Sequence, residues 1–78
     1  MTLRRHSVRI AGHATSISIE DEFWEEIQTA AQQDRISTAR LIEAIDKSRT
    51  VNAGPGRKPP NLSSALRLYV LKRLKTRG

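Results

Sequence analysis

The stretch Thr15-Ser16-Ile17-Ser18-Ile19 decides the fold class of this 78-residue chain. Its isoleucines alternate with serines, and a period of two indicates a β-strand with one buried face and one exposed face. The preceding segment 7–10 also alternates, but in the opposite phase, and a bend at Gly12 would absorb the additional residue. A lone strand needs a partner for its backbone groups. We therefore expect one short strand per chain, paired antiparallel with the same strand of a second copy.

Two helices are predicted to follow this strand. Residues 20–33 and residues 37–48 both carry apolar side chains at helical spacing. Asp34-Arg35 interrupts the pattern, and Ser37 is a good N-cap for the second helix. Ile36 and Leu41 have the spacing of a hydrophobic staple around that cap. The chain therefore reads as a strand followed by two helices joined by a short turn.

A segment rich in proline and glycine at 49–60 predicts a linker. Asn61 then caps a third helix, from Leu62 to about Lys75, with an apolar stripe too regular for a disordered tail. We expect one domain with three parts: a basic arm and core at 1–48, the linker at 49–60, and a basic amphipathic helix at 61–78. An alternative makes 61–74 the second helix of the unit and 37–60 an insertion, but short connections are commoner.

Charge is unevenly distributed along the chain, whose formal net charge is +6. Residues 1–19 and 51–78 contain basic but no acidic side chains, whereas residues 20–34 contain acidic but no basic ones. Such a protein has one face suited to a polyanion, so double-stranded DNA is a reasonable partner. Glu22, Glu25 and Glu26 share a helix with no nearby nucleophile, and no catalytic or phosphate-loop motif is present. We therefore do not expect an enzyme.

Other kinds of site are disfavoured by composition. The chain has no cysteine and only two histidines, so neither a metal site nor a cofactor is expected. No apolar run approaches the roughly 20 residues of a membrane span, and no apolar segment follows the basic start. These features predict a cytoplasmic protein without a membrane partner.

Three motifs, in this order, resemble the ribbon-helix-helix DNA-binding family of the Arc/MetJ type, and more closely a bacterial subgroup of ribbon-helix-helix domain proteins. They are Gly12-His13-Ala14-Thr15-Ser16-Ile17-Ser18-Ile19-Glu20, Glu22-Phe23-Trp24 and Asn61-Leu62-Ser63-Ser64-Ala65-Leu66-Arg67. The resemblance implies a mainly α fold with one short strand: a ribbon-helix-helix (β-α-α) unit plus a third helix. It also implies an intertwined homodimer with an intermolecular two-stranded ribbon, acting as a transcriptional repressor. Its implied base-contacting residues are Ala14, Ser16 and Ser18.

Phosphate contacts are expected at two places. The resemblance places one at Ser37-Thr38-Ala39, where free N–H groups and the helix dipole also attract anions. The basic arm offers Arg4, Arg5 and Arg9. Two positions depart from the family pattern. Ala14 replaces a frequent long basic residue, which weakens direct readout, and Arg35 replaces a frequent turn glycine, which makes the turn costly.

The apolar positions predict the core of the dimer. Its expected members are Ile17, Ile19, Phe23, Trp24, Ile27, Leu41, Ile42, Ile45, Leu66, Tyr69 and Val70. An alternative function, the antitoxin of a toxin–antitoxin pair, would use the C-terminal region to bind the toxin. The regularity of the third helix favours the regulator, because antitoxin tails usually fold only on their partner.

Overall fold

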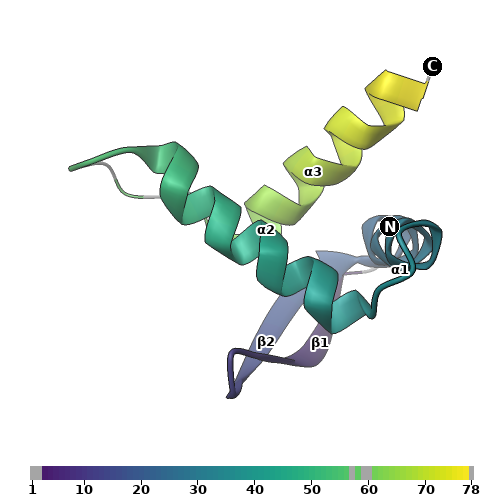
Figure 1. Ribbon diagram of the computed structural model, residues 1–78. Helices are drawn as coiled ribbons and strands as arrows, with labels where there is room; N and C mark the ends of the chain where they lie inside the picture. Colours follow the sequence, from purple (N-terminus) through teal and green to yellow (C-terminus); the bar gives the residue numbers. More distant parts are fainter. Residues whose placement is uncertain (1–2, 57, 59–60, 78) are drawn as a thin grey trace.

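The structure is a computed structural model that describes residues 3–56, 58 and 61–77. Its elements are β1 (Leu3–Ile10), β2 (His13–Glu20), α1 (Asp21–Gln33), α2 (Thr38–Ala53) and α3 (Leu62–Arg77). The two strands form an antiparallel hairpin, and the three helices pack on one side of it (Figure 1). Residues 57, 59 and 60 of the expected linker lie outside the described residues.

The expectation of one short strand per chain is wrong. Each chain has two strands of eight residues, which pair with each other within the chain. Ala11 and Gly12 connect them with φ angles of 50° and 84°, and two successive positive φ angles define the turn that best matches the twist of a hairpin. Because this turn reverses the chain locally, the ribbon strand already has a partner without a second copy.

The hairpin register also explains the opposite phases of the two alternating segments. Val8 lies opposite Thr15, and His6 lies opposite Ile17, so even positions of β1 face the same way as odd positions of β2. Directly opposed residues in an antiparallel pair share one face of the sheet. The phase change is therefore a consequence of chain reversal, and no bulge is needed to produce it.

The hydrophobic core forms within a single chain. Ile19, Ile27, Ile42 and Leu66 are fully buried, so the hairpin and each of the three helices contribute one of its most buried side chains. Every residue expected in a dimer core lies in or against this core, with Phe23, Trp24 and Tyr69 only partly buried. The core-facing side of the hairpin is thus covered by the chain's own helices.

Specific residues set the ends of the helices. Ser37 caps α2, as expected: its hydroxyl accepts a hydrogen bond from the Arg40 N–H at 3.1 Å. The turn before it is a Schellman motif, in which the Ile36 N–H donates to the Ala31 carbonyl at 3.0 Å and the Arg35 N–H to the Gln32 carbonyl at 3.1 Å. Arg35 takes the left-handed conformation of this motif, with a φ of 60°.

The second helix is longer than predicted. It continues past the expected end at 47–48 to Ala53, and Gly54, with a φ of 79°, follows it. Within this extension the Arg49 Nε lies 2.7 Å from Asp46 Oδ1, and the Thr50 hydroxyl donates to the Asp46 carbonyl at 3.3 Å. These local interactions prolong the helix into the segment expected to be linker.

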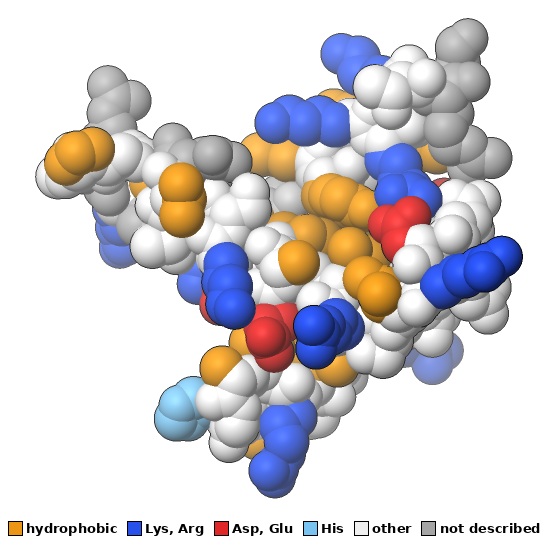
Figure 2. All heavy atoms as spheres, viewed as in Figure 1, with side chains coloured by type: hydrophobic (Ala, Val, Ile, Leu, Met, Phe, Trp, Pro, Cys, Tyr) orange, Lys and Arg blue, Asp and Glu red, His pale blue; other side chains and the backbone are white. Residues whose placement is uncertain are grey.

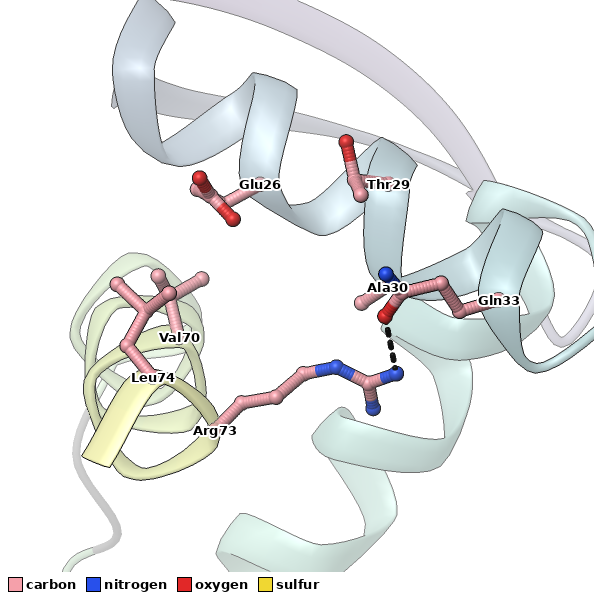
Figure 3. A pocket seen from close by; sticks show the side chains of 7 residues that line it. All are labelled: Glu26, Thr29, Ala30, Gln33, Val70, Arg73 and Leu74. Atoms are coloured by element: carbon pink, nitrogen blue, oxygen red, sulfur yellow. Dashed lines mark hydrogen bonds between the residues drawn. The ribbon is translucent and has the colours of Figure 1, made fainter. Parts of the chain in front are cut away.

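The third helix begins where predicted, with Asn61 Oδ1 accepting from the Ser64 N–H at 2.8 Å. It packs against both α1 and α2. Near its C-terminal end Arg73 donates hydrogen bonds to Asp34, Gln33 and the Tyr69 hydroxyl, and Figure 3 shows the bond to Gln33. The hollow beside Arg73 measures about 10 Å³, room for no more than one water. Both α2 and α3 pack on α1, so either helix could serve as the second helix of the unit, and the preference for the nearer one stays a prediction.

Candidate nucleic-acid interface

The hairpin has two chemically distinct faces. One faces the helices and carries Ile10, Ile17 and Ile19, which are all buried. The opposite face, here called the outward face, is formed by residues whose side chains point away from that core. Its residues are Leu3, Arg5, Ser7 and Arg9 on β1 and Ala14, Ser16, Ser18 and Glu20 on β2. All of them except the half-buried Glu20 are exposed.

The three expected base-contacting residues lie together on the outward face. Ala14, Ser16 and Ser18 follow one another along β2 at every second position, and all three are exposed. None of these side chains is longer than a hydroxymethyl group. A surface of this kind allows a close approach of the strand backbone to whatever binds it.

The three arginines of the expected arm do not act as one group. Residues 3–10 form β1, and the alternation of a strand separates them between its faces. Arg4 faces the core side, where its Nε lies 3.3 Å from Asp21 Oδ2. Arg5 and Arg9 lie on the outward face opposite Ser18 and Ala14. Within the part of the chain that the structure describes, neither has a hydrogen-bond or ion-pair partner. Sequence reasoning could have separated them only by recognising the hairpin.

Glu20 is the single acid of the outward face, and α3 neutralises it. Arg67 grips it with two bonds, Nε to Oε1 at 2.8 Å and Nη2 to Oε2 at 3.2 Å. The hydrogen bond from Arg67 holds the pKa of Glu20 below its ordinary value, with a backbone hydrogen bond adding to the effect. The Arg67 guanidinium also lies 6.0 Å from the centre of the Phe23 ring. Among the described residues, the outward face therefore presents two unpaired cations and no unpaired anion.

The outer edge of β2 retains unpaired backbone groups. The tight turn closes on the pair Ile10 and His13, and bonded and non-bonded pairs then alternate along an antiparallel ladder. The N–H and C=O groups of Ala14, Ser16 and Ser18 consequently point away from β1. The Ser63 hydroxyl donates to the Ser18 carbonyl at 2.9 Å, which agrees with this direction. Among the described residues, the edge is thus occupied at one end by Ser63 and open along the rest of β2.

The expected phosphate site at the start of α2 does not lie on the outward face of the hairpin. Ser37 and Thr38 line a hollow of about 420 Å³ between α1 and α2, together with Glu25. No hydrogen bond within the described residues joins Ser37, Thr38 or Ala39 to the outward face. A carboxylate beside a helix N-terminus competes with a phosphate there. Phosphate binding at this end stays a prediction.

A second surface lies between α2 and α3. It is a groove of about 410 Å³, and Figure 2 shows apolar side chains exposed between the two helices. Its lining residues are Ile45, Ser48, Arg49, Ala53, Ala65, Leu68, Tyr69 and Lys72. Leu68, Leu71 and Leu74 expose 44–51% of their surface along α3. The widened apolar stripe of this helix therefore exceeds what the single-chain core covers.

The aromatic residue Trp24 was expected in a core or interface. It stacks on His6 of the hairpin, with ring centres 3.9 Å apart and planes inclined by 8°. Nε2 of His6 is buried and has no hydrogen-bond partner among the described residues. The stack joins the core-facing side of β1 to α1.

Comparison with known proteins agrees with this architecture. Residues 3–74 match the ribbon-helix-helix domain family, and the chain belongs to that family. Among solved structures it is similar to an uncharacterized protein from Bordetella pertussis Tohama I, with a TM-score of 0.75 and 27% sequence identity. The match covers 95% of this chain and 57% of that one, so this chain spans little more than half of its solved relative. No curated protein matches it.

The family assignment confirms the resemblance seen in the sequence motifs. Ribbon-helix-helix domains generally occur in DNA-binding regulators and in antitoxins. Among the described helices, none combines the length and apolar character needed to cross a membrane.

Proposed function

We propose that this protein is a bacterial transcription regulator, acting as a cytoplasmic repressor and not as an enzyme, that places the outward face of its hairpin in the major groove of DNA. The single observation that carries the proposal is the composition of that face. Arg5 and Arg9 are exposed and unpaired among the described residues, and the only acid, Glu20, is bound by Arg67. An extended face with unpaired cations is complementary to a polyanion.

The dimensions and chemistry of the ribbon also support DNA as the ligand. A β-ribbon fits the major groove, and short side chains let its backbone approach the base edges. Ser16 and Ser18 can donate or accept hydrogen bonds there, and Ala14 can contact a thymine methyl group. The β2 residues therefore suit close contact with bases.

The proposal includes a homodimer that pairs along the outer edge of β2. Two copies related by a twofold axis would place their β2 strands side by side and extend the two hairpins into one four-stranded sheet, whose two central β2 strands form the two-stranded ribbon that the major groove admits. Unpaired edges are otherwise a template for uncontrolled association. The backbone groups of Ala14 and Ser16, which point away from β1, are available for this pairing.

Proline substitution tests the edge. Ser16→Pro removes an N–H that points away from β1, so it should abolish the dimer while leaving the hairpin intact. Ser7 lies directly opposite on the outer edge of β1, and Ser7→Pro is the matched control. Sedimentation equilibrium should give a monomer for Ser16→Pro and a dimer for Ser7→Pro. A dimer in both variants would exclude pairing along β2.

DNA binding itself is tested by titrating the protein onto duplex DNA at several salt concentrations. Even two neutralised phosphates make the affinity fall about tenfold between about 50 and 200 mM salt. The double variant Arg5→Ala/Arg9→Ala should bind much more weakly than wild type. Arg4→Ala, which removes a cation of the core-facing side, should retain wild-type affinity. Binding that is undetectable, or that does not depend on salt, would contradict the proposed function.

An antitoxin is the second candidate, and the apolar groove between α2 and α3 is the observation that favours it. The exposed leucines of α3 would form the surface that receives the toxin. Against this, α3 is anchored to α1 through Arg73–Asp34 and to the end of β2 through Arg67–Glu20, and Leu66 is fully buried. Limited proteolysis of the free protein distinguishes the two. Resistance of residues 61–78 supports the regulator, and rapid loss of that segment supports the antitoxin.

A further inference from the structure

The outward face has short and long side chains, and, apart from Glu20 at its end, only β1 supplies the long ones. Around Arg9 the neighbouring positions are Ser7 on the same strand and Ala14 and Ser16 on β2. All three are small and exposed. A guanidinium at Arg9 is therefore not covered by its neighbours, and nothing described on this face holds it in place.

The register places Arg9 directly opposite Ala14. By the alternation that starts at the turn, this is a non-hydrogen-bonded pair, in which the two Cα atoms approach to about 4.5 Å. The side chain of Arg9 can therefore extend over the space that the methyl group of Ala14 leaves open. Position 14 on β2 carries only a methyl group, and the long basic side chain of Arg9 lies beside it on β1.

From this juxtaposition, and resting on the proposed function, we infer that Arg9 is a specificity-determining residue that reads guanine in the major groove. Arginine can donate two parallel hydrogen bonds to the O6 and N7 atoms of guanine. Ala14 favours this contact because its small side chain leaves room beside it for the Arg9 guanidinium. Arg9 thus supplies, from the adjacent strand, the long side chain that Ala14 lacks.

The structure also supplies a matched control on the same strand. Arg4 carries the same charge, but it faces the helices and pairs with Asp21. Removing Arg4 or Arg9 changes the net charge equally, so general electrostatics predicts the same loss of affinity for both. A base contact predicts a difference between the two variants in sequence preference.

The experiment selects binding sites from randomised DNA duplexes with the full-length wild-type chain and with Arg9→Ala and Arg4→Ala. Wild type and Arg4→Ala should select the same motif, containing at least one fixed guanine. Arg9→Ala should lose the preference at that guanine and bind the wild-type site about 5- to 140-fold more weakly, with an unchanged salt dependence. Circular dichroism checks that Arg9→Ala is folded, which is expected because Arg9 is exposed and unpaired among the described residues.

A double variant moves the guanidinium to the neighbouring strand. Arg9→Ala/Ala14→Arg should regain a guanine preference, because the long side chain stays on the same face beside its original position. If the double variant recovers affinity without any base preference, Arg9 acts only through its charge and the inference is overturned.

Two further outcomes also overturn the inference, and they are distinguishable from each other. If Arg9→Ala binds all sequences more weakly by one factor and its salt slope falls by about one, Arg9 contacts a phosphate. The proposed function then survives without this reader. If the wild-type chain selects no sequence and binds no duplex, the proposed function fails and the inference fails with it.

Discussion

The two faces of one hairpin differ in what they contribute to the molecule. On the core-facing side, Ile17 and Ile19 are almost completely buried against the helices. On the outward face, Ser16 and Ser18 lie next to them in sequence and remain exposed. An alternating strand thus buries one set of residues in the core and leaves the other set free for the proposed recognition of DNA. Mutations at core-facing positions should therefore impair folding, whereas mutations at outward-facing positions should impair DNA binding.

The largest expected effect on stability is on the core-facing side. Ile19→Ala removes a fully buried side chain, and it should lower the free energy of unfolding by about 3 kcal/mol because a cavity remains. Urea denaturation measures this change. Ser18→Ala, one position away, should change the free energy of unfolding by less than about 0.5 kcal/mol, as exposed substitutions usually do. Equal losses for the two variants would show that the faces are not separated as described.

The turn that sets the register should give the next largest effect. Gly12 has a φ of 84°, which a β-branched residue adopts only with strain. Gly12→Val should therefore lower the free energy of unfolding by about 1–2 kcal/mol, again measured in urea. Ala11→Gly, at a φ of 50°, is the matched change in the opposite direction and should not destabilise the hairpin. A Gly12→Val protein as stable as wild type would argue against the tight turn.

The smallest expected effect concerns the acid at the end of the outward face. The pKa of Glu20 is lowered in the folded chain, chiefly by the hydrogen bond from Arg67. A carboxyl group whose pKa is lowered by folding stabilises the protein at pH values above its pKa in the unfolded chain, near 4.5. This stabilisation is lost as the pH falls through the lower pKa of the folded chain. The stability advantage of wild type over Glu20→Gln should thus be present at pH 7 and shrink toward pH 3.

The control for this pH dependence is Glu22→Gln, which removes a carboxyl without an ion pair among the described residues. Chemical denaturation of the three proteins at pH 7 and pH 3 gives the comparison. If the difference between wild type and Glu20→Gln is the same at both pH values, Arg67 does not stabilise the charged carboxylate.

Much of the fold could be predicted because the helices carry strong local signals. Ser37 and Asn61 cap the helices that they were expected to cap, and the serines of β2 lie on the exposed face. Family membership was also predictable from three motifs. These features depend on the spacing of residues within a single segment, and that spacing can be read directly from the sequence.

The first strand was missed because its signal is weak. Of β1, only Val8 and Ile10 had indicated a strand, and the basic residues before them resembled a mobile arm. The turn has Ala11 at a position where asparagine or aspartate would have indicated a hairpin. Arg35 likewise adopts a left-handed conformation although glycine is usual there. In both turns, a residue other than glycine adopts a positive φ that the local sequence does not favour.

The candidate site was consequently predicted in part. The exposed positions of β2 were identified from its alternation, but the partition of Arg4, Arg5 and Arg9 required the hairpin register. Only that register places Arg9 beside Ala14 and Arg5 beside Ser18. A pairing between segments is not encoded in either segment alone, and here it decides which cations face the ligand.

Amide chemical-shift mapping by NMR during titration with duplex DNA tests whether the outward face of the hairpin is the surface that binds DNA. The largest shifts should occur at residues 5, 7, 9, 14, 16 and 18, on that face. The amides along the groove between α2 and α3 should change little. Shifts concentrated on that groove, or the absence of any shift at the hairpin under conditions where DNA binds, would contradict the account.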